Sequence, residues 1–362
     1  MKKIAVICNY ELLPERVGGM DYFYWLFNTE CKKNNISVTW FFPNRSHHGK
    51  YNELEIKIPE NKESLETCFL NYCATENVNF DVVYVHFLEL CTSFYKQIKA
   101  KNSTTNLIVV DHNPRPINGY SFKRRIEKFI KGFFYAKYIN WFVSVSNESA
   151  KELKSDFFFI KDKSCKVIFN GLNMDKYIKK TDLISNQKFL VTSHLRKEKG
   201  IQDLVDVVNE IHKNKTFDFV IDVYGNGNYE SEIKKKIVNY QIEHYFNFKG
   251  SVNNLNELYK NYDYLIHPSH AETFCYSVIE SLICNVPVIT TNGAGNILKQ
   301  VDENKTGHLF NPKDKNKLYS ILTTILNTKK DYDLYYIKHR NIFLDINIAV
   351  KTFGTILYMK GQ

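Results

Sequence analysis

The sequence lacks the cysteine patterns of disulfide-rich and zinc-binding proteins. Its 362 residues hold eight cysteines, none of which forms a CxxC pair or stands at zinc-finger spacing from histidine. Several, such as Cys8 in IAVIC and Cys284 in SLIC, lie in apolar runs, where cysteine packs as a small hydrophobic residue. This pattern argues against a secreted disulfide scaffold and favours a reducing cytoplasm.

Long hydrophobic runs are also missing. No uninterrupted apolar stretch reaches the length that spans a bilayer. The first apolar run stops at Asn9, well short of the core of a secretory signal peptide. We therefore expect a cytoplasmic protein, bound at most to the inner face of the plasma membrane.

Metal-binding and dinucleotide-binding motifs are scarce as well. The only DxD, at residues 331–333, stands in a charged stretch remote from the other candidate site residues. We interpret it as a solvated helix start and expect no metal. The paired glycines Gly18 and Gly19 do not form a GxGxxG, although they let backbone approach a ligand just before a predicted helix.

What the sequence does contain is a regular alternation of strands and helices. The apolar runs are mostly continuous, which is typical of strands covered on both faces, and strand–helix alternation predicts a doubly wound α/β fold. The runs are KKIAVIC, SVTWFF, FDVVYVHF, NLIVVDH, NWFVSVS and KVIFNG in the first half, and KFLVTSH, DFVIDVYG, YFNFKG, YDYLIHPS, PVITT and GHLF in the second. Helical segments between them include 20–34, 146–156, 201–214, 230–240, 275–284 and 314–327. Twelve runs are too many for one ordinary sheet. We therefore place a boundary in the polar stretch 170–187 and expect two Rossmann-like domains facing a cleft. Their predicted ranges are 1–178 and 179–336, followed by a tail over 337–362.

Candidate ligand-binding residues follow many of the predicted strands. In such sheets ligands bind at the carboxyl ends of the strands. Arg196 and Lys199 stand three apart before Gly200, and two cations at a strand-to-helix junction can neutralise a diphosphate. A solvated turn is the other interpretation. Glycines follow further strands, and His112 stands at the end of the run NLIVVDH.

The stretch ETFCYSVIE carries Glu272 and Glu280 at its two ends. One interpretation is a buried helix with Glu272 at its positive N-terminus and Glu280 on an exposed face. Because the stretch follows another predicted strand, the alternative is that both carboxylates belong to a ligand site.

In joint order and spacing, these segments resemble the retaining GT-B glycosyltransferases of glycosyltransferase family 4 over nearly the whole chain. The resemblance implies a retaining, metal-independent hexosyltransferase with an N-terminal acceptor domain and a C-terminal nucleotide-sugar domain. It implies a UDP- or GDP-linked donor, no other cofactor, and a glycan or lipid-linked saccharide acceptor in bacterial O-antigen or capsule synthesis. The segments that carry it are VGGM, DH, SHLRKEKG, YGNGN, FKGSV and HPSHAETFCYSVIESLICNVPVITTNGAG.

The resemblance also gives roles to single residues. It implies that Glu272 contacts the transferred sugar, that Arg196 and Lys199 bind the diphosphate, and that His112 approaches the sugar. Glu280 is expected to hold the ribose hydroxyls. The remaining binding residues are expected to be Gly18, Gly19, Gly225, Ser251, Val252, Thr273, Phe274 and Cys275.

The sequence departs from the family pattern after the first glutamate. Thr273 and Cys275 stand where the family usually has glycines. Their side chains lie beside the backbone amides that meet sugar and phosphate in the family, so we expect them to influence the choice of donor.

The net charge of +10 is concentrated in one segment. Residues 113–140 hold seven basic side chains and one acidic one, among apolar residues at helical spacing. One interpretation is a core helix with a basic outer face. The alternative is a surface helix over 121–138 that contacts an anionic membrane.

Other functions remain open at this stage. A sugar-nucleotide epimerase of the GT-B fold is one alternative, and a glycosyltransferase-like subunit without activity is another. A non-enzymatic basic protein that binds nucleic acid is a third, although the chain shows no nucleic-acid motif and we expect no such partner.

Overall fold

The computed structural model describes residues 1–15, 17–60, 62–116, 118–172, 174–181, 186–214 and 217–328. The chain divides into two compact units, of which the first holds Met1–Leu172 and the second begins at Asn173. The boundary lies a few residues before the expected one. The predicted tail over 337–362 and the DxD at 331–333 lie outside the described residues.

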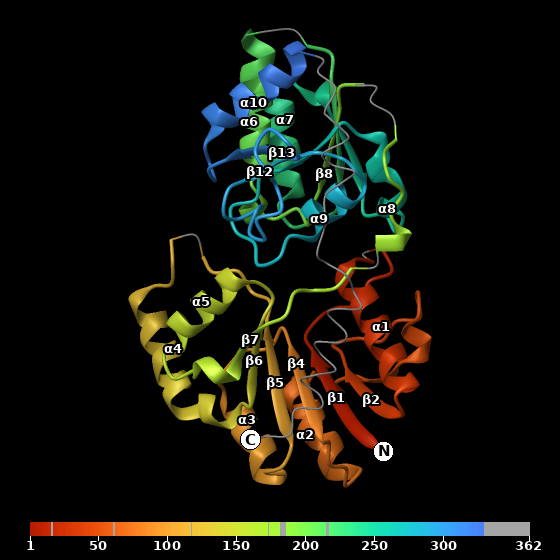
Figure 1. Cartoon of the computed structure of the whole chain (residues 1–362), viewed down its shortest axis with the longest axis vertical. Helices are drawn as coiled ribbons and strands as arrows, with labels where there is room; N and C mark the ends of the chain where they lie inside the picture. Colours follow the sequence, from red (N-terminus) through yellow and green to blue (C-terminus); the bar gives the residue numbers. More distant parts are fainter. Residues whose placement is uncertain are drawn as a thin grey trace. The chain divides into compact units, whose positions relative to one another are not determined.

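The N-terminal unit is built on a seven-stranded parallel sheet in the order β3-β2-β1-β4-β5-β6-β7 (Figure 1). Six of the strands coincide with predicted apolar runs, whereas the three-residue β3 was not predicted. The elements of this unit are β1 (Lys2–Cys8), α1 (Gly19–Lys33), β2 (Ile36–Phe41), β3 (Glu55–Lys57), α2 (Leu65–Thr75), β4 (Val82–His86), α3 (Ser93–Lys101), β5 (Asn106–Asp111), α4 (Phe122–Tyr135), β6 (Trp141–Ser144), α5 (Asn147–Asp156) and β7 (Cys165–Val167).

The second unit carries a six-stranded parallel sheet in the order β10-β9-β8-β11-β12-β13. All six strands and the helices α6, α7, α9 and α10 lie where the sequence predicted them. The elements are β8 (Lys188–Thr192), α6 (Ile201–Asn214), β9 (Val220–Tyr224), α7 (Glu230–Tyr240), β10 (Phe246–Gly250), α8 (Leu255–Leu258), β11 (Tyr264–His267), α9 (Tyr276–Ile283), β12 (Val288–Thr291), β13 (Gly307–Phe310) and α10 (Lys315–Thr328). Two parallel sheets of this kind confirm the predicted Rossmann-like fold class.

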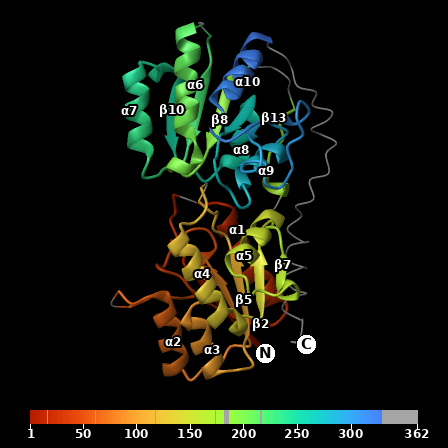
Figure 2. The same ribbon diagram turned by 90° about the vertical axis from the view of Figure 1, so that its left-hand side faces the viewer.

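Helices cover both faces of the second sheet. One core places side chains of α6, α7 and α10 against β8, β9, β11 and β12, and Figure 2 shows these three helices near one another. A separate core on the other face packs α9 and the tyrosines Tyr259 and Tyr262 against the same strands. This double covering explains why the strands read as continuous apolar runs.

Each sheet reverses its strand order at one point. In the N-terminal sheet the order runs outward in both directions from the neighbours β1 and β4, and in the second sheet from β8 and β11. The loops that follow such a pair leave in opposite directions and open a crevice at the carboxyl ends of the strands. The fold therefore points to the loops after β1, β4, β8 and β11.

The amphipathic helix α4 does not bury its apolar face. Its six large apolar side chains are between 44% and 79% exposed, and they are Phe122, Ile126, Phe129, Ile130, Phe133 and Phe134. The core-helix interpretation is therefore wrong. The basic side chains are also distributed differently from expectation. Lys128 is buried against Asp156, and Arg124 and Lys131 each contact Glu89 and Glu127.

Candidate active site

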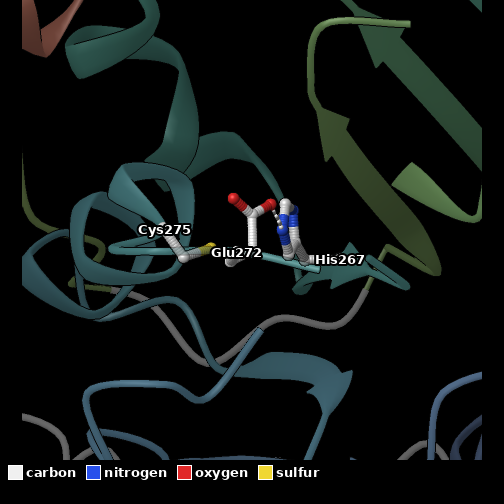
Figure 3. A group of neighbouring side chains, drawn as sticks. All are labelled: His267, Glu272 and Cys275. Atoms are coloured by element: carbon white, nitrogen blue, oxygen red, sulfur yellow. Dashed lines mark hydrogen bonds and ion pairs between the residues drawn. The ribbon is translucent and has the colours of Figure 1, made fainter. Parts of the chain in front are cut away.

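A buried ion pair joins the two loops at the reversal point of the second sheet. Lys199 follows β8 and Glu272 follows β11, and Lys199 Nζ lies 2.6 Å from Glu272 Oε1. The side chains are 13% and 11% exposed. His267, the last residue of β11, lies with its Nε2 2.9 Å from the same carboxylate oxygen. Glu272 is therefore held from two sides, as Figure 3 shows for His267 (Figure 3).

The two partners determine the charge of Glu272. Burial alone would raise the pKa of this carboxyl group. The positive charge of Lys199 and the hydrogen bond with His267 outweigh burial and hold the pKa well below its usual value. The group is thus ionised at neutral pH and acts only as a hydrogen-bond acceptor.

Among the described residues, one group of side chains could hold a metal. One ligand atom from each of His267, Glu272 and Cys275 lies within 4.8 Å of the others, and the Cys275 sulfur is turned towards Glu272 in Figure 3. However, the ammonium group of Lys199 already sits against the carboxylate. A bound cation would have to displace it, so the residues fit an ion-paired site better than a metal site.

Cys275 adopts a backbone conformation that side chains other than glycine rarely take. It precedes α9 with φ +63° and ψ +73°, in the left-handed region, and its side chain is buried. Such a residue costs of the order of 1 kcal/mol or more and persists only where its surroundings impose it. The position where the family usually has glycine therefore keeps a glycine-like backbone, with a thiol added beside Glu272.

Glu280, one of the two predicted glutamates, lies in α9 and has both oxygens occupied. Tyr177 donates to Oε1 at 2.9 Å, and Tyr259 donates to Oε2 at 2.8 Å. Burial raises the pKa of this carboxyl group, and the two tyrosine hydroxyls only partly oppose the shift. The surroundings therefore shift the pKa values of Glu272 and Glu280 in opposite directions. Glu280 is not on a solvated helix face.

Close backbone approach explains two of the strand-end glycines. A Cβ on Gly200 would lie 2.0 Å from the carbonyl oxygen of Pro268, and Gly200 has φ +71°. A Cβ on Gly225, at φ +113°, would lie 1.9 Å from the carbonyl oxygen of Ser193. Only glycine fits either position. These contacts bring the loops after β9 and β11 against the loop after β8, which carries Lys199.

The other residues predicted for this unit take different positions. Arg196 is exposed and pairs with Glu198 at 3.2 Å, and it does not share the contact that Lys199 makes. Ser251 and Val252 follow β10 and are half-buried, while Thr273 and Phe274 are buried just before α9. Their binding roles stay predictions.

In the N-terminal unit, the paired glycines begin α1 as expected. Gly18 precedes the helix in an extended conformation, and a Cβ there would meet nothing within 4 Å. Its N–H donates to Asp21 Oδ2 at 2.9 Å. Asp21 is fully buried and also accepts hydrogen bonds from Tyr51 and Tyr10 at 2.6 and 3.2 Å. The open space beside Gly18 would allow a ligand to contact the backbone there.

His112 follows β5 and pairs with a second histidine. His112 Nε2 and His86 Nδ1 lie 2.9 Å apart, and the ring of Phe87 stacks on His112 at 4.4 Å. Burial lowers the pKa of His112 to about 3, so the ring is neutral at physiological pH. His86 ends β4, the strand at the reversal point of this sheet.

Several residues that build these sites were not predicted from the sequence. His267 could have been found, because it stands at the end of the run YDYLIHPS. Asp21 could have been found as an acidic residue at the third position of a helix, where it caps the backbone. Tyr177 and Tyr259 gave no signal, since they lie 103 and 21 positions from Glu280.

Comparison with known proteins finds a family match for the second unit. Residues 173–340 match the family described as glycosyl transferases group 1. The second unit is therefore similar to a glycosyl transferases group 1 domain. The matched residues include the Lys199–Glu272 pair and all the loops that surround it.

Curated relatives match part of the chain. The UDP-N-acetylglucosamine–peptide N-acetylglucosaminyltransferase GtfA subunit of Streptococcus pneumoniae is 33% identical over 100 residues, which are 28% of this chain and 20% of that protein. Protein CapJ of Staphylococcus aureus is 29% identical over 195 residues, which are 52% and 47%. The matched region thus spans about half or less of these relatives.

The fold is shared with a solved structure over almost the whole chain. HepE of Anabaena, in complex with UDP and glucose, has a TM-score of 0.75 and 16% identity, with 99% of each chain covered. At this identity the likeness establishes the fold, which is GT-B.

The left-handed conformation of Cys275 leads to a stability prediction. We expect Cys275→Gly to change the free energy of unfolding by no more than about 1 kcal/mol, because relief of strain offsets the lost burial. Cys284 is the matched control, since it is also buried but has φ −77°. Cys284→Gly relieves no strain and should lower the free energy of unfolding by about 1–2 kcal/mol. Equal losses in urea denaturation of the two variants would show that Cys275 is not strained.

The opposite pKa shifts of the two glutamates lead to opposite pH dependences. The lowered pKa of Glu272 contributes stability above its unfolded pKa, and this contribution is lost as pH falls through the folded pKa. The raised pKa of Glu280 favours the protonated folded state, so its ionisation destabilises the fold as pH rises. In thermal unfolding from pH 4 to pH 8, the melting temperature of Glu272→Gln should therefore fall relative to wild type as pH rises. That of Glu280→Gln should rise relative to wild type, and parallel trends would contradict the assignment.

Proposed function

We propose that the chain transfers a sugar from a nucleoside-diphosphate sugar to a saccharide acceptor. The observation that carries this proposal is the Lys199–Glu272 pair at the reversal point of a glycosyl transferases group 1 domain. In the proposed assignment Lys199 and Arg196 bind the diphosphate and Glu272 accepts hydrogen bonds from hydroxyls of the transferred sugar. Glu280 exchanges its tyrosine partners for the ribose hydroxyls.

The chemistry of the step follows from where charge develops. Breaking the bond between the sugar and the diphosphate leaves negative charge on the departing phosphate. A cationic side chain and the N-terminal amides of α9 can stabilise this charge without a metal. No side chain of the site is an obvious nucleophile. We therefore propose attack on the same face as the leaving group, with its phosphate oxygen taking the proton of the acceptor hydroxyl and with retention at the anomeric carbon.

The named relatives guide the choice of donor. The GtfA subunit is named for UDP-N-acetylglucosamine, and HepE was solved with UDP and glucose. For this chain we propose a UDP-linked hexose as the first donor class to test and a GDP-linked one as the second. We further propose a cytoplasmic enzyme of surface polysaccharide synthesis whose acceptor is a glycan or lipid-linked saccharide.

Removing either side chain of the central pair should abolish most of the activity. A thermal-shift screen of UDP- and GDP-sugars identifies the donor, and release of nucleoside diphosphate is then measured with and without saccharide acceptors. We expect Lys199→Ala and Glu272→Ala to lower kcat by about 100-fold or more, the usual effect of losing one charge-stabilising group.

The matched control is Lys197→Ala in the same short turn, because this exposed lysine makes no contact with Glu272. It should retain near-normal activity. Near-normal activity of both site variants would contradict the proposed function. Release of nucleoside diphosphate without any acceptor would instead favour the epimerase alternative.

We also propose that the N-terminal unit binds an anionic membrane surface through residues 121–138. The exposed apolar side chains of α4 are joined by Phe158 and Phe159. The ring of Phe159 contacts those of Phe129, Phe133 and Phe158. Lys123 and Arg125 lie exposed on the same helix. Aromatic and basic side chains together are typical of helices that lie in a bilayer interface. Among the described residues no helix is long and apolar enough to cross one.

Vesicle sedimentation tests this membrane association. We expect binding to vesicles that contain phosphatidylglycerol, weakened by salt and weakened several-fold by Phe133→Ser or Lys123→Gln. Val238→Ser is the control, because Val238 is equally exposed but lies on α7 in the other unit. No binding, or binding that both kinds of variant leave unchanged, would contradict the proposal.

A further inference from the structure

The N-terminal unit has a large cavity beside α4. Its volume is about 840 Å³, which lies in the range of small-molecule sites. The loop after β5, the first half of α4 and the second half of α5 line it. All of these segments belong to one unit, and no residue that lines the cavity is among those assigned above to sugar transfer.

Most of the charged side chains that line the cavity are paired with one another. Arg115 donates from Nε to Asp156 Oδ2 at 2.8 Å and from Nη1 to Asp111 Oδ2 at 2.6 Å. Lys128 Nζ lies 3.3 Å from Asp156 and 4.4 Å from the ring centroid of Tyr120. Glu152 also faces Arg115, at 3.8 Å. Because these groups pair with one another, they hold this part of the lining in place, and little of their charge is available to a ligand.

Arg125 differs from these cations. It lines the same cavity and is exposed, and no ion pair of Arg125 is found among the described residues. Lys151, the other exposed cation of the wall, pairs with Glu148. A guanidinium group without a carboxylate partner can donate two parallel hydrogen bonds to a phosphate.

The lining of the cavity also includes apolar side chains. Ile126, Phe129 and Phe158 belong to it and are 44%, 50% and 75% exposed. Phe129 also contacts Phe159, so the apolar part of the lining continues into the exposed aromatic surface of α4. The cavity thus offers both a cation and an apolar surface.

We infer that this cavity binds a lipid phosphate, with the phosphate at Arg125 and the first part of the apolar chain along Ile126, Phe129 and Phe158. Inorganic phosphate would use only Arg125, and a neutral lipid would use only the apolar side chains. The cavity is also larger than a phosphate group needs. The inference rests on the proposed membrane association and adds to it a specific site for one class of lipid.

A soluble probe tests the site apart from membranes and from sugar transfer. Decyl phosphate below its micelle concentration is titrated by calorimetry into the full chain, alongside decanol and inorganic phosphate. We expect decyl phosphate to bind at least tenfold more tightly than either, because only it engages both Arg125 and the apolar side chains of the lining.

Matched variants locate the binding. Arg125→Gln should weaken decyl phosphate binding about tenfold, whereas Lys123→Gln, which removes an exposed cation of α4 outside the cavity, should not. Phe129→Ser should weaken it, whereas Phe134→Ser, equally exposed but outside the cavity, should not. Unchanged melting temperatures confirm that these surface variants fold.

Three results would overturn the inference. They are equal loss in Arg125→Gln and Lys123→Gln, binding of inorganic phosphate as tight as that of decyl phosphate, and binding of decanol as tight as that of decyl phosphate. Failure of the proposed function looks different. In that case nucleoside diphosphate release or vesicle binding is absent while the Arg125-dependent binding of decyl phosphate remains.

Discussion

The ion pair between Lys199 and Glu272 is the interaction on which the second unit is organised. Each charge loses water on burial, and the attraction between buried partners often does no more than compensate for that loss. Stability alone therefore gives little reason to keep the pair. Its position gives a better one. The pair lies where the strand order reverses. Gly200 and Gly225 allow the neighbouring loops to pack closely around it.

Strands were predictable from the sequence because both faces of each sheet are covered. Double covering requires continuous apolar runs, and every such run became a strand within a few residues. The edge strand β3 escaped prediction because three residues with two charged side chains, EIK, leave no periodicity to detect. Helices α6, α7 and α10 were predictable because each buries one apolar stripe against the sheet.

Site residues were predictable only where their position at the end of a predicted strand was enough to place them near a ligand. Glycines, cations and carboxylates at strand ends could be found because parallel strands bring their carboxyl ends to one edge. Side-chain pairing could not be found in this way. Lys199 and Arg196 were expected to act together on a diphosphate, but the contact of Lys199 with Glu272, 73 residues away, was not expected. Likewise, the fold brings Tyr177 into contact with Glu280, 103 residues away. The spacing of residues within a short segment cannot predict such contacts.

Helix α4 was predictable as a helix, but its surroundings could not be predicted from the periodicity of its sequence. An apolar stripe at helical spacing predicts a helix, but it does not tell whether protein or another medium covers the stripe. In this unit, α2, α3 and α5 already supply the core that covers the sheet beside α4. Six large apolar side chains on α4 therefore remain exposed, together with Phe158 and Phe159. Soluble monomers seldom expose so many contiguous apolar groups, because each one forgoes the free energy of burial. Contact with an apolar environment outside the unit would recover this free energy of burial.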